Sequence, residues 1–209
     1  MTDPTAQRPI APPRAMVNVA TDLTQSPPPF VLPGHYSWAE FETLESIIRK
    51  ESKLRMTYLD GVIELRPLGE DHQSISRMIG LLIMLYLFKQ NIEFIPVGSA
   101  TRYSEEKLVS FEPDESYYLG KKKEHPDLAV EVNLRSDGLK KLEKYRRLGI
   151  QEVWIWSDNS ITIYCLENSQ YSIARESQLL PVLDIRLLES CILFPSRLEA
   201  IDQFYQRAS

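Results

Sequence analysis

The sequence predicts an α/β fold, with a mixed sheet flanked by helices in an α+β element order. Candidate helices and strands alternate along the chain. The helix predicted over residues 73–89 is apolar on nearly all sides from Met78 onward, which is typical of a helix packed centrally against a sheet. An apolar run at 128–132 indicates a buried strand. With 209 residues, 43% of them hydrophobic, the chain can form one domain with one core.

The N-terminal segment differs in composition from the rest of the chain. Residues 1–33 hold eight of the fourteen prolines and show little hydrophobic periodicity. We therefore expect residues 1–33 to form a flexible Pro-rich arm and residues 34–209 to form a single domain that ends in a helix. Removal of the arm should leave folding intact.

Local signals predict the elements of the domain in order. Ser37 and Glu40 form an S-x-x-E capping box before a helix. Asp60-Gly61 readily takes the positive φ angles of a hairpin turn between two strands over 53–66. The other expected elements are strands at 92–97, 115–119 and 128–132, a helix over 137–148 closed by Gly149, a hairpin of 152–156 with 161–166, and a C-terminal helix capped by Ser196 and Glu199.

The charge distribution bears on the kind of partner. A net charge of −5 argues against a protein that coats nucleic acid nonspecifically. Nevertheless, the segment 121–147 has nine Lys or Arg residues against five Asp or Glu residues, so it carries +4 on an acidic body. A polyanion would respond to this basic zone. A solvated helix face next to a lysine-rich loop explains the same residues.

Compartment and redox state follow from what the sequence lacks. The chain starts without a basic and then apolar export signal, and its most apolar stretch, 78–88, is shorter than the ~18 residues of a membrane span. We expect a cytoplasmic protein with no membrane contact. Cys165 and Cys191 have no partner at metal-ligand spacing, which predicts two buried, reduced thiols.

Glu131 is the most informative residue. It interrupts the apolar strand 128–132, where an unpaired carboxylate would cost several kcal/mol. A bound cation or a lysine is the usual compensation. A strand with one partly hydrated face and an ordinary ion pair is the alternative.

Asp114 enters the preceding strand behind Pro113, so two adjacent strands can present two carboxylates to one point. Mg²⁺ binds through one or two carboxylates plus water, so this pair is a sufficient protein ligand set. A turn residue after proline is the alternative for Asp114. Asp127 follows a second proline and lies four residues before Glu131 on the same strand, which suits a supporting role.

Lys141 is the third candidate. The apolar stripe of the 137–148 helix consists of Leu139, Leu142, Tyr145 and Leu148. At about 100° per residue, Lys141 flanks this stripe, whereas Lys140, Lys144 and Arg147 are predicted to point away. Lys141 can therefore reach inward, although a solvated lysine along the helix edge fits the same position.

These residues resemble the PD-(D/E)XK nuclease superfamily and, within it, the Uma-two family of restriction-endonuclease-like proteins. The resemblance covers roughly 37–166 and is carried by Tyr58-Leu59-Asp60-Gly61-Val62-Ile63-Glu64, by Glu70-Asp71-His72, by Pro113-Asp114 with Pro126-Asp127-Leu128-Ala129-Val130-Glu131-Val132, and by Lys141-x-x-x-Tyr145 running into Gly149-Ile150-x-Glu152-Val153-Trp154.

The resemblance implies a restriction-endonuclease-like core in which Asp114 and Glu131 hold Mg²⁺ or Mn²⁺. Asn133 stands where the superfamily pattern has its lysine, and Lys141 occupies the position of the replacement in the Uma-two branch. The family also places Glu64 near the metal, although Glu64 fits an exposed strand position. His72 either caps the apolar helix or contacts substrate or a metal-bound water, and capping is the simpler interpretation.

Two functions compete. The first is metal-dependent endonucleolytic hydrolysis of phosphodiester bonds in nucleic acid, with DNA favoured over RNA. The second is a non-catalytic nuclease-fold module that binds nucleic acid or a protein partner; Asn133 and the acidic net charge favour it, whereas the intact Asp114, Glu131 and Lys141 set favours the enzyme. No feature favours a carboxylate-pair glycosidase. By analogy with nucleases that cut two strands, a homodimer is a further expectation.

The two interpretations of Glu131 predict different effects of Glu131→Gln. If the carboxylate is buried to hold a cation, the metal-free variant should be at least as stable as the wild type. If the carboxylate is ion-paired for stability, glutamine should cost about 3 kcal/mol or more because it strands a buried charge.

Overall fold

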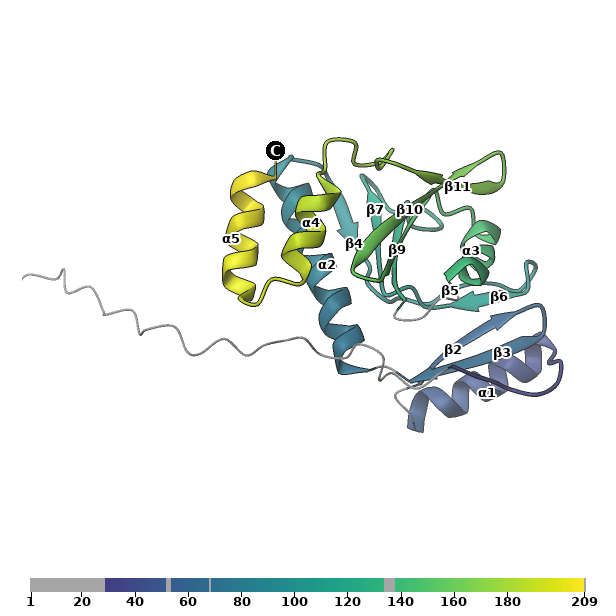
Figure 1. The fold of residues 1–209 in the computed structure, drawn as a ribbon. Helices are drawn as coiled ribbons and strands as arrows, with labels where there is room; N and C mark the ends of the chain where they lie inside the picture. The colour runs from purple at the N-terminus through teal and green to yellow at the C-terminus, as the bar shows by residue number, and fades with distance from the viewer. Residues whose placement is uncertain (1–28, 52–53, 68, 134–137, 209) are drawn as a thin grey trace, which may run out of the picture.

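The computed structural model of the chain describes residues 29–51, 54–67, 69–133 and 138–208. Within these residues it contains five helices, eleven strands and two sheets (Figure 1). The chain is therefore a mixed α/β protein, as the sequence predicts.

The smaller sheet has the strand order β1-β3-β2-β6-β5. Its strands are β1 (Phe30–Val31), β2 (Leu54–Leu59), β3 (Val62–Pro67), β5 (Arg102–Ser104) and β6 (Val109–Phe111). Helix α1 (Trp38–Glu51) packs against the β2–β3 hairpin, where Phe41, Met56, Tyr58 and Ile63 are buried together (Figure 1).

The predicted start and turn of this unit are confirmed. The backbone N–H of Ser37 donates to Glu40 Oε2 at 2.7 Å, and the N–H of Glu40 faces Ser37 Oγ at 3.4 Å, which is the reciprocal pattern of a capping box. Asp60 and Gly61 have φ angles of 46° and 79°, as a two-residue hairpin turn requires.

The β2–β3 hairpin has two chemically different faces because side chains alternate along a strand. Met56, Tyr58 and Ile63 face α1 and are buried. Across the hairpin, Arg55 is paired with Arg66 and Thr57 with Glu64, so these four residues share the opposite, polar face. That polar face covers the candidate site described below.

The larger sheet has the strand order β11-β10-β9-β8-β7-β4. Its strands are β4 (Phe94–Pro96), β7 (Glu115–Leu119), β8 (Leu128–Val132), β9 (Glu152–Ser157), β10 (Ser160–Glu167) and β11 (Gln170–Ala174). β8 and β9 are parallel, and α3 (Gly138–Arg147) connects them, whereas the other neighbours are antiparallel. The sheet is therefore mixed.

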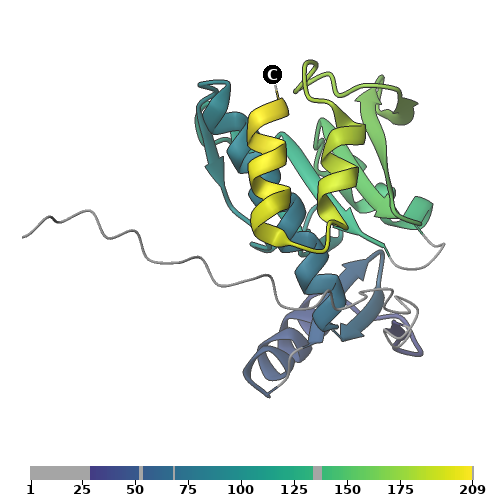
Figure 2. The ribbon, with the colours of Figure 1, turned by 60° about the vertical axis from the view of Figure 1, so that its left-hand side comes forward.

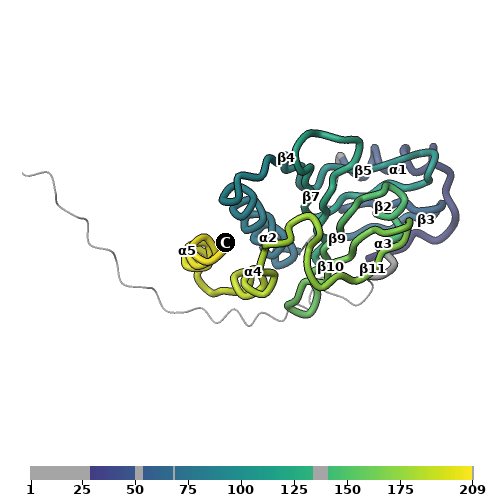
Figure 3. The backbone as a smooth tube through the Cα atoms, turned by 90° about the horizontal axis from the view of Figure 1, so that it is seen from above, coloured from purple at the N-terminus to yellow at the C-terminus, as the bar shows by residue number. Residues whose placement is uncertain are grey.

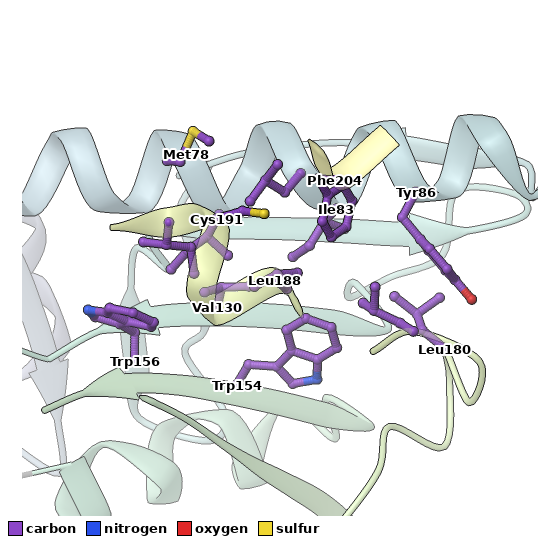
Figure 4. Packing of buried hydrophobic residues seen from close by; sticks show 14 of the residues in the cluster. Met78, Ile83, Tyr86, Val130, Trp154, Trp156, Leu180, Leu188, Cys191 and Phe204 are labelled. Carbon is purple, nitrogen blue, oxygen red and sulfur yellow. The ribbon is translucent and has the colours of Figure 1, made fainter. Parts of the chain in front are cut away.

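Helices cover both faces of the larger sheet. α2 (Glu70–Lys89), α4 (Ile185–Ile192) and α5 (Arg197–Arg207) lie on one face, and α3 lies on the other (Figures 1 and 3). Figure 2 shows α4 and α5 side by side in front of α2. The core between the three helices and the sheet includes Ile83, Val130, Trp154, Leu188 and Phe204 (Figure 4).

The N-terminal boundary needs correction. β1 pairs antiparallel with β3, and the N–H of Leu32 donates to Ile63 O at 2.9 Å, so the end of the predicted arm belongs to the fold. Two extended residues give too short a pattern to be recognised beside seven prolines. Residues 1–28, Lys53 and Asp137, where other predicted elements begin, lie outside the described residues.

Two further sequence expectations can be compared with the fold. Cys165 and Cys191 are buried and form no disulfide, in line with the expected thiols. No helix in the described part of the chain combines the length and the apolar character needed to cross a bilayer.

Candidate active site

The candidate site lies at the carboxyl end of β8, between α3 and the polar face of the β2–β3 hairpin. Glu131 is 1% exposed and shares its side of the sheet with Ala129 and the buried residues of α3. The Tyr145 hydroxyl donates to Glu131 Oε1 at 2.7 Å, and Lys144 Nζ lies 3.0 Å from the same oxygen. The other oxygen, Oε2, lies 4.0 Å from Lys141 Nζ.

The groups around Glu131 keep its side chain ionised. Burial alone would raise the pKa of Glu131, but the positive charges of Lys144, Lys141 and Arg66 and the Tyr145 hydrogen bond hold that pKa well below its usual range. The reciprocal effect is seen at the phenol, because burial and the Glu131 charge raise the pKa of Tyr145 well above its usual range.

Lys141 reaches inward, as the helix geometry predicts. Its side chain is 7% exposed, and Nζ has no hydrogen-bond partner among the described residues. Burial lowers the pKa of Lys141; the charges of Arg66 and Lys144 act in the same direction, and those of Glu131 and Asp114 oppose it. The buried Nζ of Lys141 therefore donates no hydrogen bond to any described residue, although it lies 4.0 Å from Glu131 Oε2.

Lys144 also reaches inward, so the prediction that it points away is wrong. Its Nζ lies 4.8 Å from the centre of the Phe111 ring, in addition to its ion pair with Glu131. Lys144 sits at the margin of the apolar stripe, and β6 supplies an aromatic face for its charge.

Arg147 does point away, toward Asp60, whereas the side chains of Leu139 and Lys140 lie outside the described part.

Asp114 is brought beside Glu131 by its backbone. The N–H of Asp114 donates to Val130 O at 3.1 Å, and the N–H of Val132 donates to Asp114 Oδ2 at 2.7 Å, so these two bonds flank Glu131. Arg55 from β2 pairs with Asp114 Oδ1. Both Asp114 and Glu131 act on the pKa values of Lys141 and Tyr145, so the structure brings the three predicted residues Asp114, Glu131 and Lys141 together.

His72 does not cap α2, which corrects the simpler interpretation. The N-cap of α2 is Gly69, without a side-chain hydrogen bond, and His72 lies within the first turn. His72 Nε2 is 3.1 Å from Asp114 Oδ2, but neither ring nitrogen has a hydrogen bond of good geometry among the described residues. The pair is therefore a close contact without a hydrogen bond. The alternative role of His72, contact with substrate or with a metal-bound water, stays a prediction.

The other supporting candidates divide into two groups. Glu64 borders the site through Arg66, whose Nη2 lies 3.5 Å from Glu64 Oε1 and whose charge acts on Glu131 and Lys141. Asn133 is buried directly after β8, where its N–H donates to Trp156 O at 2.7 Å. Asn133 is therefore near Glu131 by strand position, whereas Glu64 is connected to the site only through Arg66.

Asp127 lies away from the site. Its Oδ2 accepts from the N–H of Leu119 at 2.8 Å, and its Oδ1 pairs with Lys123, so it stabilises the turn between β7 and β8. At about 3.3 Å per residue, Asp127 is roughly 13 Å along the strand from Glu131. These contacts give Asp127 a structural role.

The donor chemistry fits a hard divalent cation. No group of three or more His, Cys, Asp or Glu side chains suited to a metal occurs in the described ranges. The residues that could hold a cation there are the two carboxylates of Asp114 and Glu131. Such a pair, completed by water, suits Mg²⁺ or Mn²⁺. The buried nitrogens of Lys141 and His72, which have no hydrogen bond among the described residues, are groups that coordinated water molecules could satisfy.

The site includes residues that the sequence reasoning did not assign to it, namely Arg55, Arg66, Lys144 and Tyr145. Tyr145 was counted in the apolar stripe, and only its hydroxyl could have indicated a buried polar partner. Arg55 and Arg66 alternate with apolar residues in two strands, which is a signal for a polar hairpin face but not for what that face covers.

The family model described as "Putative restriction endonuclease" (Uma2) matches residues 38–192. The chain therefore belongs to this family, as the sequence motifs predict. The family is of the nuclease type.

Two further comparisons complete this picture. The crystal structure of a "putative nuclease belonging to DUF820" from Anabaena variabilis is 14% identical, with a TM-score of 0.48, and the match covers 82% of this chain and 98% of that one. Comparison with curated proteins gives no match.

Proposed function

We propose that the protein is an endonuclease that hydrolyses phosphodiester bonds in nucleic acid, DNA rather than RNA, with Mg²⁺ or Mn²⁺ held by Asp114 and Glu131. The observation that carries this proposal is the meeting of the buried carboxylates of Asp114 and Glu131 with Lys141 Nζ, which lies 4.0 Å from Glu131 Oε2 and has no hydrogen bond among the described residues. The nuclease-type family supports it.

The residues of the site would have different roles in the proposed hydrolysis. A bound divalent cation would supply Lewis acidity at the scissile phosphate. Lys141 would donate hydrogen bonds to the attacking water or to a phosphate oxygen as charge develops there. Lys144 and Tyr145 would fix the orientation of Glu131, and the N–H of Val132 would fix that of Asp114.

The second candidate function, a non-catalytic binding module, is favoured by one specific observation. Both carboxylates are already paired with basic side chains, Asp114 with Arg55 and Glu131 with Lys144. A site whose charges are balanced without a cation can be purely structural. Catalysis therefore has to be tested directly.

The test is cleavage of supercoiled plasmid and of single-stranded DNA by the purified chain in Mg²⁺, in Mn²⁺ and in EDTA. We expect metal-dependent nicking that is lost in EDTA and in Asp114→Asn. A Lys89→Met variant, which alters a contact with Tyr205 at the C-terminal end of α2, should retain the wild-type rate. Cleavage that persists in EDTA, or equal cleavage by Asp114→Asn, would contradict the proposed site, and stable DNA binding without cleavage in either metal would favour the module.

A further inference from the structure

Arg55 stands between two carboxylates. Its Nη1 pairs with Asp114 Oδ1, and its Nε lies 3.6 Å from Oε2 of Glu112, two residues earlier in the chain. The Arg55 side chain is 12% exposed, whereas Asp114 is fully buried and Glu112 is 22% exposed. The same guanidinium therefore contacts one buried and one more accessible acid.

We infer that Arg55 is a latch on the candidate site: it occupies Asp114 in the metal-free protein and moves to Glu112 when a divalent cation binds. This inference rests on the proposed role of Asp114 as a cation ligand. It assigns to Arg55 a control over metal binding that goes beyond the proposed reaction.

The contacts of Asp114 make Arg55 the partner that must leave. Asp114 Oδ2 accepts the Val132 N–H at 2.7 Å and lies 3.1 Å from His72 Nε2. Release of the Val132 bond would remove one of the two hydrogen bonds that join Asp114 to β8. Oδ1 is therefore the atom a cation would take, and Arg55 is bound to it.

Glu112 offers the displaced guanidinium a partner without a large movement. Arg55 is already within 3.6 Å of it, and a planar guanidinium can bind a carboxylate through two parallel hydrogen bonds. Glu112 also pairs with Arg49 at 3.1 Å, but Arg49 is 49% exposed and has Glu45 as a second partner at 3.0 Å. The ion pair between Arg49 and Glu112 can therefore break while Arg49 remains paired with Glu45.

Electrostatic interactions determine whether loss of the Arg55 charge or of the Glu112 charge strengthens or weakens metal binding. A divalent cation and the Arg55 guanidinium at one carboxylate repel each other, and low-dielectric surroundings strengthen that repulsion. Loss of the Arg55 charge should therefore tighten metal binding. Loss of the Glu112 charge should weaken it, because the displaced guanidinium would meet a neutral group in place of a carboxylate.

The experiment is calorimetric titration of MnCl₂ into the full chain, with thermal melting in the same buffers as a second readout. The variants are Arg55→Met, Glu112→Gln and the control Lys123→Met, which removes one positive charge from the ion pair of another buried aspartate, Asp127. We expect Arg55→Met to bind Mn²⁺ about tenfold more tightly than the wild type. Glu112→Gln should bind several-fold more weakly, and the control should be unchanged.

The outcomes separate the latch from the proposed function. If the wild type binds Mn²⁺ and Arg55→Met binds it no more tightly, the latch is wrong and the metal site stands. If neither binds Mn²⁺, both ideas fail. Should Arg55→Met fold poorly, Glu112→Gln decides, because an affinity equal to that of the wild type would overturn the latch.

Discussion

Glu131→Gln is expected to lower the free energy of unfolding by about 3 kcal/mol at neutral pH, because it strands the buried Lys144 charge. Tyr145 can still donate to the glutamine oxygen, so the loss reflects the ion pair and not an empty space. Denaturant unfolding measures the difference. Glu64→Gln, whose carboxylate is 31% exposed and lies 3.5 Å from Arg66, is the matched control and should change stability by about 0.5 kcal/mol or less.

The pH dependence of stability gives an independent check on Glu131. Its folded pKa lies well below the value of 4.5 for an unfolded glutamate, so between these values the unfolded chain binds more protons. The stabilisation is complete above pH 4.5 and is lost as pH falls from there toward the folded pKa. The variant should therefore lose less stability than the wild type over this acid range. The ion pair would contribute little to stability if the free energies of unfolding of the two proteins changed in parallel with pH. The same conclusion would follow if the variant were as stable as the wild type at neutral pH.

Lys141→Met is expected to separate stability from activity. Burial lowers the pKa of Lys141 and its Nζ lacks a hydrogen-bond partner among the described residues, so an apolar side chain of similar length should raise stability by about 1 kcal/mol. The same change removes the proposed donor to the developing charge, so cleavage should fall by about 10²- to 10³-fold.

Single-turnover nicking and denaturant unfolding of the same preparation measure both effects of Lys141→Met. Lys144→Met provides the contrast, because it breaks the 3.0 Å ion pair of Glu131 and should lower stability. Unchanged cleavage by Lys141→Met would remove Lys141 from the mechanism. A large loss of stability in that variant would show that its charge supports the fold.

The parts of the fold that sequence could predict are those governed by local rules. The Ser37–Glu40 capping box, the Asp60-Gly61 turn and the apolar run of β8 each depend on a few neighbouring residues. β7 and β8 have the predicted bounds, and α2 begins three residues earlier than predicted because Glu70 and Asp71 suit a first turn. Glu131 is predicted as a site residue because a carboxylate in an apolar strand needs compensation, and the structure places Asp114 and Lys141 beside it.

The parts that sequence could not predict depend on tertiary contacts. β5 and β6 have three residues each, so alternation within them is too short to detect. Lys144 turns inward because Phe111, distant in sequence, offers it an aromatic face. Arg55 belongs to the site because its hairpin face covers Asp114, and no spacing within β2 could indicate that neighbour.

Thermal melting with and without Mn²⁺, performed on the wild type, Asp114→Asn and Glu131→Gln, tests most directly whether these two carboxylates form a cation site. A ligand that binds only the folded state raises stability by about 2.7 kcal/mol at a hundred times its dissociation constant. We predict that Mn²⁺ raises the melting temperature of the wild type and leaves both variants unchanged. If Mn²⁺ leaves the melting temperature of the wild type unchanged, Glu131 is a structural ion-pair residue and the metal-dependent nuclease site is wrong.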